Sequence, residues 1–402
     1  MNVELMRKLD YWFGIPLCFL LTEINYILKL FSSKKKKTIH KKFLFIKLSE
    51  MGSIILAYPL MKKIQREYEE APLFFLTFKK NAPIFQVLNI VPPSNVLTIR
   101  DDTFSKFLFD TLKVIVRIRK ESIDTVFDLE FFSRFTAIVA YLTGAKMRVG
   151  FYKYRFEGLY RGKILTNNVQ YNPLLHISKM YLSFAEALKL EEKFTPCLER
   201  KVNDSELVLP NIDLPIEVEE MVYNRLKNLG IDGDKRLFLI NPGEGKLPLR
   251  EWPIENFIKL SKMLLEDKKN YIFIVGSKEA VKNAERLFCA VNSERCISLA
   301  GKTSLLELLA LFKKADVLIV NDCGLAHLGS LTSIKKIILF GPESPHIFGP
   351  LDRNSYVIYV NLPCSPCFSV FNHRSSACRD NKCLKLIKAE EIYDLVKNLI
   401  GF

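Results

Sequence analysis

The chain has 402 residues, a hydrophobic content of 49% and a formal net charge of +15 at pH 7. This length implies two or so domains, and the hydrophobic content is ample for two cores. The positive charge indicates long-range attraction to nucleic acid, acidic lipid or phosphorylated sugars. Nucleic acid is not expected, because the sequence contains no zinc finger, RNP-type aromatic motif or basic helix with heptads.

The N-terminal segment, residues 1–37, is apolar from Tyr11 to Phe31 and ends in the lysine run Lys34–Lys37. Its uninterrupted apolar core is shorter than the roughly 20 residues that a membrane span needs. Apolar residues recur at helical spacing at Leu17, Leu21, Ile24, Leu28 and Phe31. The pattern favours an amphipathic helix in the membrane interface, with the lysines on acidic headgroups. The alternatives are a true span and a helix packed on the protein's own surface, whereas the missing small-residue cleavage site argues against a secretory signal.

The next segment predicts a buried strand from Phe43, followed by a glycine turn and a helix. Gly52 would let the chain turn tightly and approach a substrate. Lys47, at the end of this strand, is either a functional cation or a solvent-facing residue. Further strands are expected at residues 73–78, 96–99, 125–129 and 148–151.

Residues 191–215 lack sustained periodicity and contain several turn formers, which indicates an interdomain connection. We therefore expect three parts: the N-terminal segment 1–37, a domain of residues 38–205 and a domain of residues 206–402.

The second half alternates strands and helices, with about 30 to 40 residues per unit, which predicts a parallel doubly wound sheet. A strand from Leu237 gives way to Asn241-Pro-Gly243, and a helix begins at about Ile254. The loop between them would place backbone amides, Lys246 and Arg250 at one sheet edge.

The strand Val317–Val320 is followed by Asn321, Asp322, Gly324 and His327. Open α/β sheets bind ligands at the carboxyl ends of their strands. A helix N-terminus at Gly324 would attract an anion such as a diphosphate. The alternative is that Asp322 only caps this helix and that His327 only packs on it.

Four motifs occur in a fixed order: Asn241-Pro-Gly243, Trp252-Pro253, Asp322-Cys-Gly-Leu-Ala-His327 and Phe340-Gly-Pro-Glu-Ser-Pro345. Together with the segments 43–59 and 148–151, they resemble the bacterial lipopolysaccharide heptosyltransferase family, glycosyltransferase family nine, over roughly residues 40–400. The resemblance implies a GT-B fold, in which two Rossmann-like doubly wound parallel-sheet domains face a cleft.

The resemblance also implies a peripheral enzyme on the cytoplasmic face of a bacterial inner membrane. This enzyme would transfer heptose from ADP-heptose to a lipid-linked saccharide acceptor, with inversion. The expected donor residues are Asn241, Gly243, Lys246, Arg250, Asp322, Gly324 and His327, and the acceptor would meet the turn Lys47–Ser53. No Walker loop is present, and no Asp-x-Asp carboxylate pair offers itself for a metal-bound diphosphate. We therefore expect Lys246 and Arg250 to stabilise the departing diphosphate without a metal or other required cofactor. The alternatives are another nucleotide-hexose donor and a non-catalytic nucleotide-sugar or lipid-saccharide binding protein.

The chain departs from the family at the first turn, where the family usually has Gly-Asp and this chain has Gly52-Ser53. In the family that Asp is the proposed base that deprotonates the acceptor. A serine with no adjacent base cannot do this at neutral pH. Glu50 lies on the same turn and is our candidate base, with Ser53 and Lys47 as the other catalytic candidates; the alternative is that the chemistry is altered or lost.

Nine cysteines are present. Five of them, in apolar or helical contexts, behave as small hydrophobic residues: Cys18, Cys197, Cys289, Cys296 and Cys323. The other four form a cluster in the sequence: Cys364, Cys367, Cys378 and Cys383. The first pair of this cluster has metal-ligand spacing, so a structural zinc site, disulfides and reduced thiols are all open.

Overall fold

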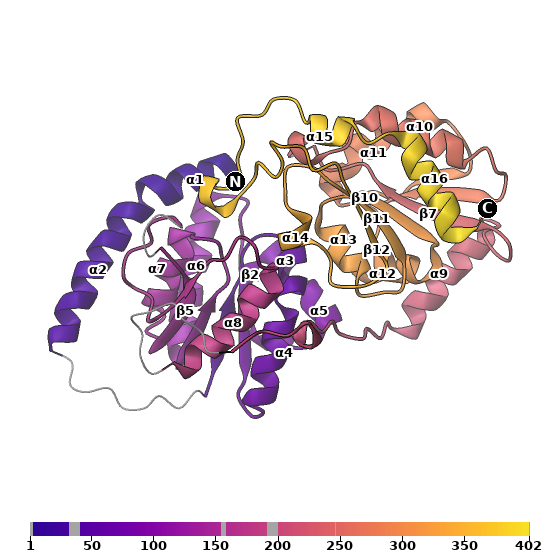
Figure 1. Cartoon of the computed structure of the whole chain (residues 1–402). Helices are drawn as coiled ribbons and strands as arrows, with labels where there is room; N and C mark the ends of the chain where they lie inside the picture. Colours follow the sequence, from indigo (N-terminus) through magenta and orange to yellow (C-terminus); the bar gives the residue numbers. More distant parts are fainter. Residues whose placement is uncertain (1–2, 32–40, 154–157, 191–199, 246, 402) are drawn as a thin grey trace. The chain divides into compact units, whose positions relative to one another are not determined.

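The computed structural model describes residues 3–31, 41–153, 158–190, 200–245 and 247–401. The chain divides into two compact units, Met1–Val208 and Leu209–Phe402. Each is an α/β unit built on a parallel six-stranded sheet, coloured indigo to magenta in the first unit and mostly orange in the second (Figure 1). The doubly wound architecture expected from the alternating pattern is therefore present in both units.

The sheet of the first unit has the order β3-β2-β1-β4-β5-β6. Its strands are β1 (Phe43–Ile46), β2 (Leu73–Phe78), β3 (Val96–Ile99), β4 (Thr125–Asp128), β5 (Met147–Tyr152) and β6 (Asn167–Gln170). Phe43 of β1 lies opposite Leu73 of β2 and Thr125 of β4, so β1 is central. Its buried rings stack on those of the neighbouring strands, Phe45 on Phe75 and on Phe127. Five of these strands match the predicted runs; β6, which is polar, was missed.

The helices of the first unit are α1 (Val3–Trp12), α2 (Gly14–Leu30), α3 (Met51–Leu56), α4 (Tyr58–Glu67), α5 (Ile84–Leu88), α6 (Phe104–Lys120), α7 (Arg134–Leu142) and α8 (Ile177–Lys189). Single 3-10 turns lie at η1 (Lys79–Asn81), η2 (Pro93–Asn95) and η3 (Asp204–Glu206).

The sheet of the second unit has the order β12-β11-β10-β7-β8-β9. Its strands are β7 (Arg236–Asn241), β8 (Asn270–Ile274), β9 (Cys296–Ser298), β10 (Val317–Asn321), β11 (Lys335–Phe340) and β12 (Ser355–Tyr359). The adjacency of β7 and β10 brings Asn241 opposite Val320. The carboxyl ends that carry the expected donor residues therefore meet at one edge of the sheet.

The helices of the second unit are α9 (Ile216–Asn228), α10 (Ile254–Leu264), α11 (Val281–Val291), α12 (Leu305–Lys314), α13 (Gly324–Gly329), α14 (Pro345–Phe348), α15 (Lys382–Lys385) and α16 (Ala389–Ile400). Its 3-10 turns are η4 (Pro248–Arg250), η5 (Lys278–Ala280) and η6 (Val370–Asn372). Local signals explain the boundaries: Ser304 and Glu307 form a capping box at the start of α12.

The N-terminal helices pack against the first unit. Cys18 and Leu21 of α2 are buried in a cluster with Ala137 and Ile138 of α7. Thr22 accepts a hydrogen bond from the backbone of Lys163, at 2.8 Å. We expected the apolar stripe of α2 to face the membrane. This expectation is wrong in part, because Leu21 of the stripe and the polar Thr22 both face the protein.

The outward surface of this segment is strongly apolar. Trp12, Phe13 and Phe19 are among its exposed side chains. The 24-residue stretch Leu5–Leu28 is, by length and composition alone, sufficient to cross a membrane, although its uninterrupted apolar core is shorter than the roughly 20 residues of a span. The lysine run Lys34–Lys37 lies outside the described residues.

Asp10 of α1 fixes this segment to the domain. Its carboxylate accepts hydrogen bonds from the backbone N–H groups of Arg134 and Phe135, both at 2.9 Å. It also pairs with the guanidinium of Arg134, at 3.1 Å. Asp10 thus caps α7 from another helix and compensates a buried cation.

We predict that Asp10→Ala lowers the free energy of unfolding by about 3 kcal/mol, because it removes a helix cap and leaves Arg134 buried without its counter-ion. Denaturant unfolding followed by circular dichroism measures this change. Asp102→Ala, which removes an exposed pair with Lys106, is the matched control and should have little effect. Equal unfolding midpoints for the two variants would contradict the capping role.

Candidate functional site

The carboxyl edge of the second sheet is organised by two asparagines, each the last residue of its strand. Asn241, at the end of β7, donates from Nδ2 to the carbonyl of Val275 at 2.7 Å and accepts from the N–H of Gly243 at 3.1 Å. Asn321, at the end of β10, accepts from the N–H of Trp252 at 2.9 Å. Asn241, expected to contact the donor, therefore shapes the loop that follows β7.

That loop requires glycine at Gly243. Its φ is +102°, and an added Cβ would lie 2.6 Å from the carboxyl carbon of Glu251. Glu251 in turn accepts a hydrogen bond from the N–H of Gly245 at 2.6 Å, and burial raises the pKa of its carboxyl group. The loop is thus held by its own side chains. Lys246, the expected donor cation in this loop, lies outside the described residues.

Arg250 and Asp322 come together from segments that are 72 residues apart. The Arg250 guanidinium donates to the Asp322 carboxylate at 2.7 Å and to the Asp322 carbonyl at 2.9 Å. The side chain of Asp322 is almost completely buried. The alternative that Asp322 only caps α13 is wrong, since the cap position belongs to Cys323 and carries no side-chain cap bond. Asp322 instead orients Arg250.

The helix α13 begins at Gly324 and contains only six residues. It therefore aligns few peptide dipoles, so its N-terminus offers less positive potential than that of a long helix. The half-buried residue Cys323 has a thiol that interacts with the backbone N–H groups of Leu325 and Ala326, and desolvation raises its pKa to about 12. A thiol in this state is protonated and is no nucleophile. His327, the last expected donor residue, is buried in the same helix.

Glu343 is a site residue that the sequence analysis did not single out. It follows β11 within the motif Phe340–Pro345 and is completely buried. Its Oε1 accepts from Arg374 at 2.6 Å, whereas its Oε2 has no hydrogen-bond partner among the described residues. Burial raises the pKa of Glu343, against the opposing effect of Arg374 and Arg250. The position of the charged residue Glu343 inside a turn motif could have indicated a functional role. The nearby sequence could not identify its partner Arg374, which lies 31 residues later.

In the first unit, Lys47 is buried with an exposed fraction of 1%. Its Nζ lies 2.7 Å from Glu130 Oε2. The other oxygen of Glu130 accepts from the N–H groups of Leu48 and Ser49, at 2.8 and 3.1 Å. Lys47 is therefore no solvent-facing residue, and its charge is neutralised. Glu130, which the sequence analysis missed, holds the start of the turn.

The turn before α3 brings Glu50 and Ser53 together. Glu50 adopts a φ of +65°, which is uncommon for a residue other than glycine and costs conformational energy. The hydroxyl of Ser53 donates to Glu50 Oε2 at 3.2 Å. Gly52 lies inside α3 and is absent from the glycines with positive φ, so the expectation that it forms the tight turn is wrong. The sharp change of direction is made by Glu50.

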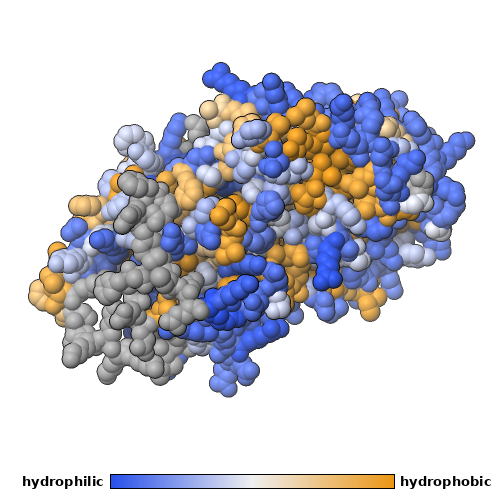
Figure 2. All heavy atoms as spheres, in the orientation of Figure 1, coloured by the Kyte–Doolittle hydropathy of each residue, from blue (hydrophilic) through white to orange (hydrophobic). Residues whose placement is uncertain are grey.

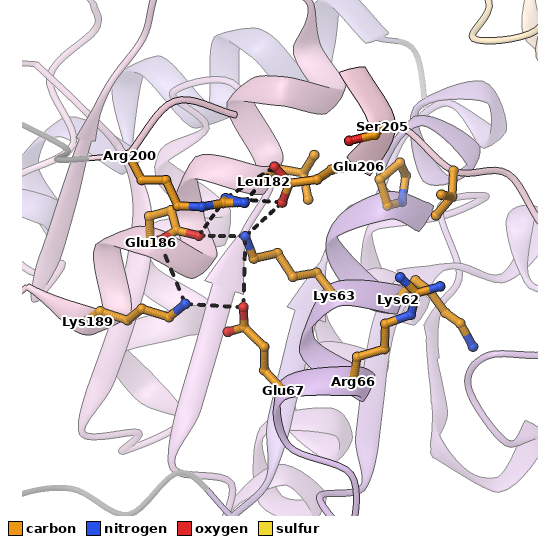
Figure 3. A pocket seen from close by; sticks show the side chains of 12 residues that line it. Lys62, Lys63, Arg66, Glu67, Leu182, Glu186, Lys189, Arg200, Ser205 and Glu206 are labelled. Carbon is orange, nitrogen blue, oxygen red and sulfur yellow. Dashed lines mark hydrogen bonds and ion pairs between the residues drawn. The ribbon is translucent and has the colours of Figure 1, made fainter. Parts of the chain in front are cut away.

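A polar cavity of about 290 Å³ also lies in the first unit, between α4, α8 and residues 200–208 (Figure 3). Lys63 points into a group of carboxylates and contacts Glu186 at 2.5 Å and Glu206 at 3.0 Å. Burial alone would lower the pKa of Lys63, but these two carboxylates raise it. Arg200 binds Glu206 at 2.7 Å. These pairs fasten the connecting segment to the unit, and the cavity contains none of the expected site residues.

The eight described cysteines are all free thiols, so the disulfide alternative is not supported; Cys197 lies outside the described residues. Cys383 is buried, which raises its pKa, and the neighbouring thiols Cys364, Cys367 and Cys378 raise it further. Cys289, expected in an apolar or helical context, lies on helix α11 and is exposed. Within the described part of the chain, no group of three or more His, Cys, Asp or Glu side chains is placed to hold a metal ion.

Comparisons with known proteins place the chain among sugar transferases. The family model described as glycosyltransferase family 9 (heptosyltransferase) matches residues 111–376. Lipooligosaccharide heptosyltransferase 2 of Haemophilus influenzae is 28% identical over 177 residues, which are 43% of this chain and 49% of that protein. Lipopolysaccharide heptosyltransferase 1 of Campylobacter coli is 22% identical over 90% of this chain and 99% of its own length. The chain thus spans about half the length of the first of these relatives and nearly all of the second.

Solved structures share the fold. The E. coli ADP-heptose lipopolysaccharide heptosyltransferase II superposes with a TM-score of 0.68 and 18% identity, over 89% of this chain and 98% of that one. The E. coli heptosyltransferase WaaC with ADP gives a TM-score of 0.61 and 16% identity, over 89% and 99% of the two chains. The predicted GT-B class is therefore confirmed. Because the family model covers more than half of the sequence, the chain belongs to glycosyltransferase family 9 (heptosyltransferase).

Proposed function

We propose that the protein transfers heptose from ADP-heptose to a lipid-linked saccharide acceptor in the synthesis of lipopolysaccharide or a related cell-surface glycan. Transfer would proceed with inversion and without a metal ion. The observation that carries this proposal is the Arg250–Asp322 pair at the carboxyl edge of the second sheet, beside the buried Glu343. Family membership supports it, as do structural neighbours described with ADP and with ADP-2-deoxy-2-fluoro heptose.

The donor would be bound through charge and hydrogen bonds at this edge. Arg250, oriented by Asp322, supplies positive charge where a diphosphate leaves. The Asn321 Nδ2 and Glu343 Oε2 atoms are buried and have no hydrogen-bond partner among the described residues. A buried polar atom without a hydrogen bond costs free energy unless a ligand or water molecule binds it. Ribose or sugar hydroxyls can both donate and accept the hydrogen bonds that these two atoms need.

The acceptor hydroxyl would be activated at the turn of the first unit. Glu50 carries an exposed carboxylate on a strained backbone, and Ser53 holds one of its oxygens. This arrangement suits a general base that keeps its position before substrate arrives. The Lys47–Glu130 pair would act as a positioning element, because it fixes the backbone that leads into the turn.

A second candidate function is non-catalytic binding of a nucleotide-sugar or lipid-linked saccharide. It is favoured by Ser53, which stands where the family usually keeps an acid. Transfer of another nucleotide-hexose would use the same fold. Turnover with ADP-heptose distinguishes both alternatives from the main proposal.

The enzyme would work as a peripheral protein on the cytoplasmic face of the inner membrane, where a lipid-linked acceptor is accessible. The exposed apolar side chains of α1 and α2 support this location, since an interfacial helix buries its apolar face at the headgroup boundary. Acidic lipid would attract the lysine run that follows them in the sequence.

We predict that Arg250→Gln raises the Kd for ADP by about 10-fold or more, because charge-assisted hydrogen bonds to a phosphate are worth about 1.5–3 kcal/mol. Isothermal titration calorimetry measures the Kd. Arg286→Gln, which removes an exposed arginine paired with Glu255 on the same unit, serves as the control and should leave the Kd unchanged. Indistinguishable affinities of the two variants would exclude Arg250 from the donor site.

We predict that Glu50→Gln lowers kcat by about 10²–10⁴-fold with little change in donor affinity, because it abolishes basicity and retains size. Ser53→Ala should lower kcat much less, and Glu70→Gln, at an exposed position, should leave it unchanged. The measurement is ADP release from ADP-heptose with a lipid-linked acceptor. Full turnover by Glu50→Gln would place the base elsewhere, whereas donor binding without any turnover by the unaltered protein would favour the non-catalytic function.

We further propose that Cys364, Cys367, Cys378 and Cys383 hold a structural metal. The described arrangement forms no such site, so binding would require these thiols to draw together. A four-thiolate set suits zinc, and elemental mass spectrometry should find about one equivalent of it. Cys364→Ser with Cys367→Ser should lower the melting temperature and leave ADP affinity of the folded fraction intact. Metal-free protein whose melting temperature does not respond to a chelator would overturn this assignment.

A further inference from the structure

The helix α6 exposes large apolar side chains along its length. Five of them are between 49% and 63% exposed: Phe104, Leu108, Phe109, Leu112 and Val116. The packing of α6 on the sheet does not need them, because a different set of residues is buried: Thr111, Val114 and Ile118. A contiguous row of this kind on a soluble surface usually marks an interaction site.

Basic side chains run beside this apolar row. Lys106, Lys113 and Lys120 recur every seven residues and therefore lie along one line of the helix. All three are exposed, and Lys106 pairs with the exposed Asp102 at 2.6 Å. The only acidic residue of α6, Asp110, is bound bidentately by Arg100, at 2.7 and 2.8 Å. The outward surface thus combines an apolar row with net positive charge, which is the pattern of a helix that lies in the interface of an anionic membrane.

The same unit carries a second apolar surface. Met6 of α1 packs on the core cluster that also receives Phe107 of α6 and Phe135 of α7. The helix α1 therefore approaches the side of the domain where α6 lies. Exposed residues of α1 and α2 include aromatic side chains, which favour the headgroup zone of a bilayer. Hydrophobic atoms are visible at the left edge of Figure 2, where the far end of α2 lies in Figure 1.

We propose that the outer face of α6 is a second membrane-contact surface, which inserts its apolar row into the interface of an anionic bilayer and places its lysines on the headgroups. A bilayer fits better than a protein partner, because the apolar and basic rows run in parallel over the whole helix and a further apolar surface lies on the same unit. The inference rests on the proposed membrane location of the enzyme, but lipid contact can be measured without catalysis.

Fluorescence quenching tests the contact directly. The chain has two tryptophans, Trp12 and the buried Trp252. In a Trp12→Phe background, Leu112→Trp should be quenched by vesicles of phosphatidylcholine and brominated phosphatidylglycerol. Ile216→Trp, at an exposed position of the second unit, is the matched control and should keep its fluorescence.

Vesicle sedimentation tests the energetics. Phe109→Ser with Leu112→Ser should lower the partition coefficient of the full chain by about 10-fold or more, since each buried apolar side chain contributes strongly to lipid binding. Ile216→Ser with Leu386→Ser removes two exposed apolar residues elsewhere and should have little effect. Lys113→Gln with Lys120→Gln should weaken binding to vesicles with phosphatidylglycerol and leave binding to pure phosphatidylcholine unchanged.

The outcomes separate the proposals. Quenching of the native Trp12 without quenching at position 112 would overturn the role of α6 and leave the N-terminal helices as the only membrane contact among those tested. Loss of a dimer in Phe109→Ser with Leu112→Ser, seen by analytical ultracentrifugation without lipid, would show that a second copy covers α6 and would also overturn the proposal. If the protein is not a transferase, it will release no ADP from ADP-heptose in detergent solution with a lipid-linked acceptor. That result does not depend on whether α6 contacts lipid.

Discussion

The parallel pairing of β7 with β10 is the constraint on which the candidate donor site depends. It places Asn241 beside the end of β10, although about 80 residues separate them in sequence. Both strands are buried, so the polar groups at their ends must find partners close by. Asn321 binds the backbone of Trp252, and Asp322 binds Arg250. The sheet therefore fixes the loop that carries Arg250, and among the described residues the buried Asn321 Nδ2 and Glu343 Oε2 atoms have no hydrogen-bond partner.

The first unit meets the same requirement with a buried ion pair. Burying the charge of Lys47, which follows β1, would cost free energy without a counter-ion. Glu130 supplies this counter-ion from the end of the neighbouring strand β4. Glu130 also accepts a hydrogen bond from the backbone of Ser49, the residue before Glu50. This bond fixes the backbone next to the strained residue Glu50. The two candidate sites thus share a feature: long-range pairs between residues at strand ends hold the loops that carry the candidate site residues.

The sequence predicted five strands of the first unit and both β7 and β10 of the second, because buried parallel strands are continuous apolar runs, but it did not predict β9, β11 or β12. It also predicted the edge at which Arg250 and Asp322 meet. It could not predict the partners Glu130 and Glu343, since their pairs form across distant segments. We predicted the tight turn at Gly52, because glycine is the residue that most often adopts a positive φ. In the structure Glu50 adopts the positive φ instead. The face of α2 was misjudged because apolar residues surround most of that helix, so periodicity alone does not identify the face that packs.

The most direct test of the account is where the donor binds. Photolabelling with 8-azido-ADP, followed by peptide mass spectrometry, should modify residues in the loops after β7, β10 and β11, and ADP-heptose should protect them. Labelling confined to the first unit, or labelling that ADP-heptose does not reduce, would contradict a donor site at the carboxyl edge of the second sheet.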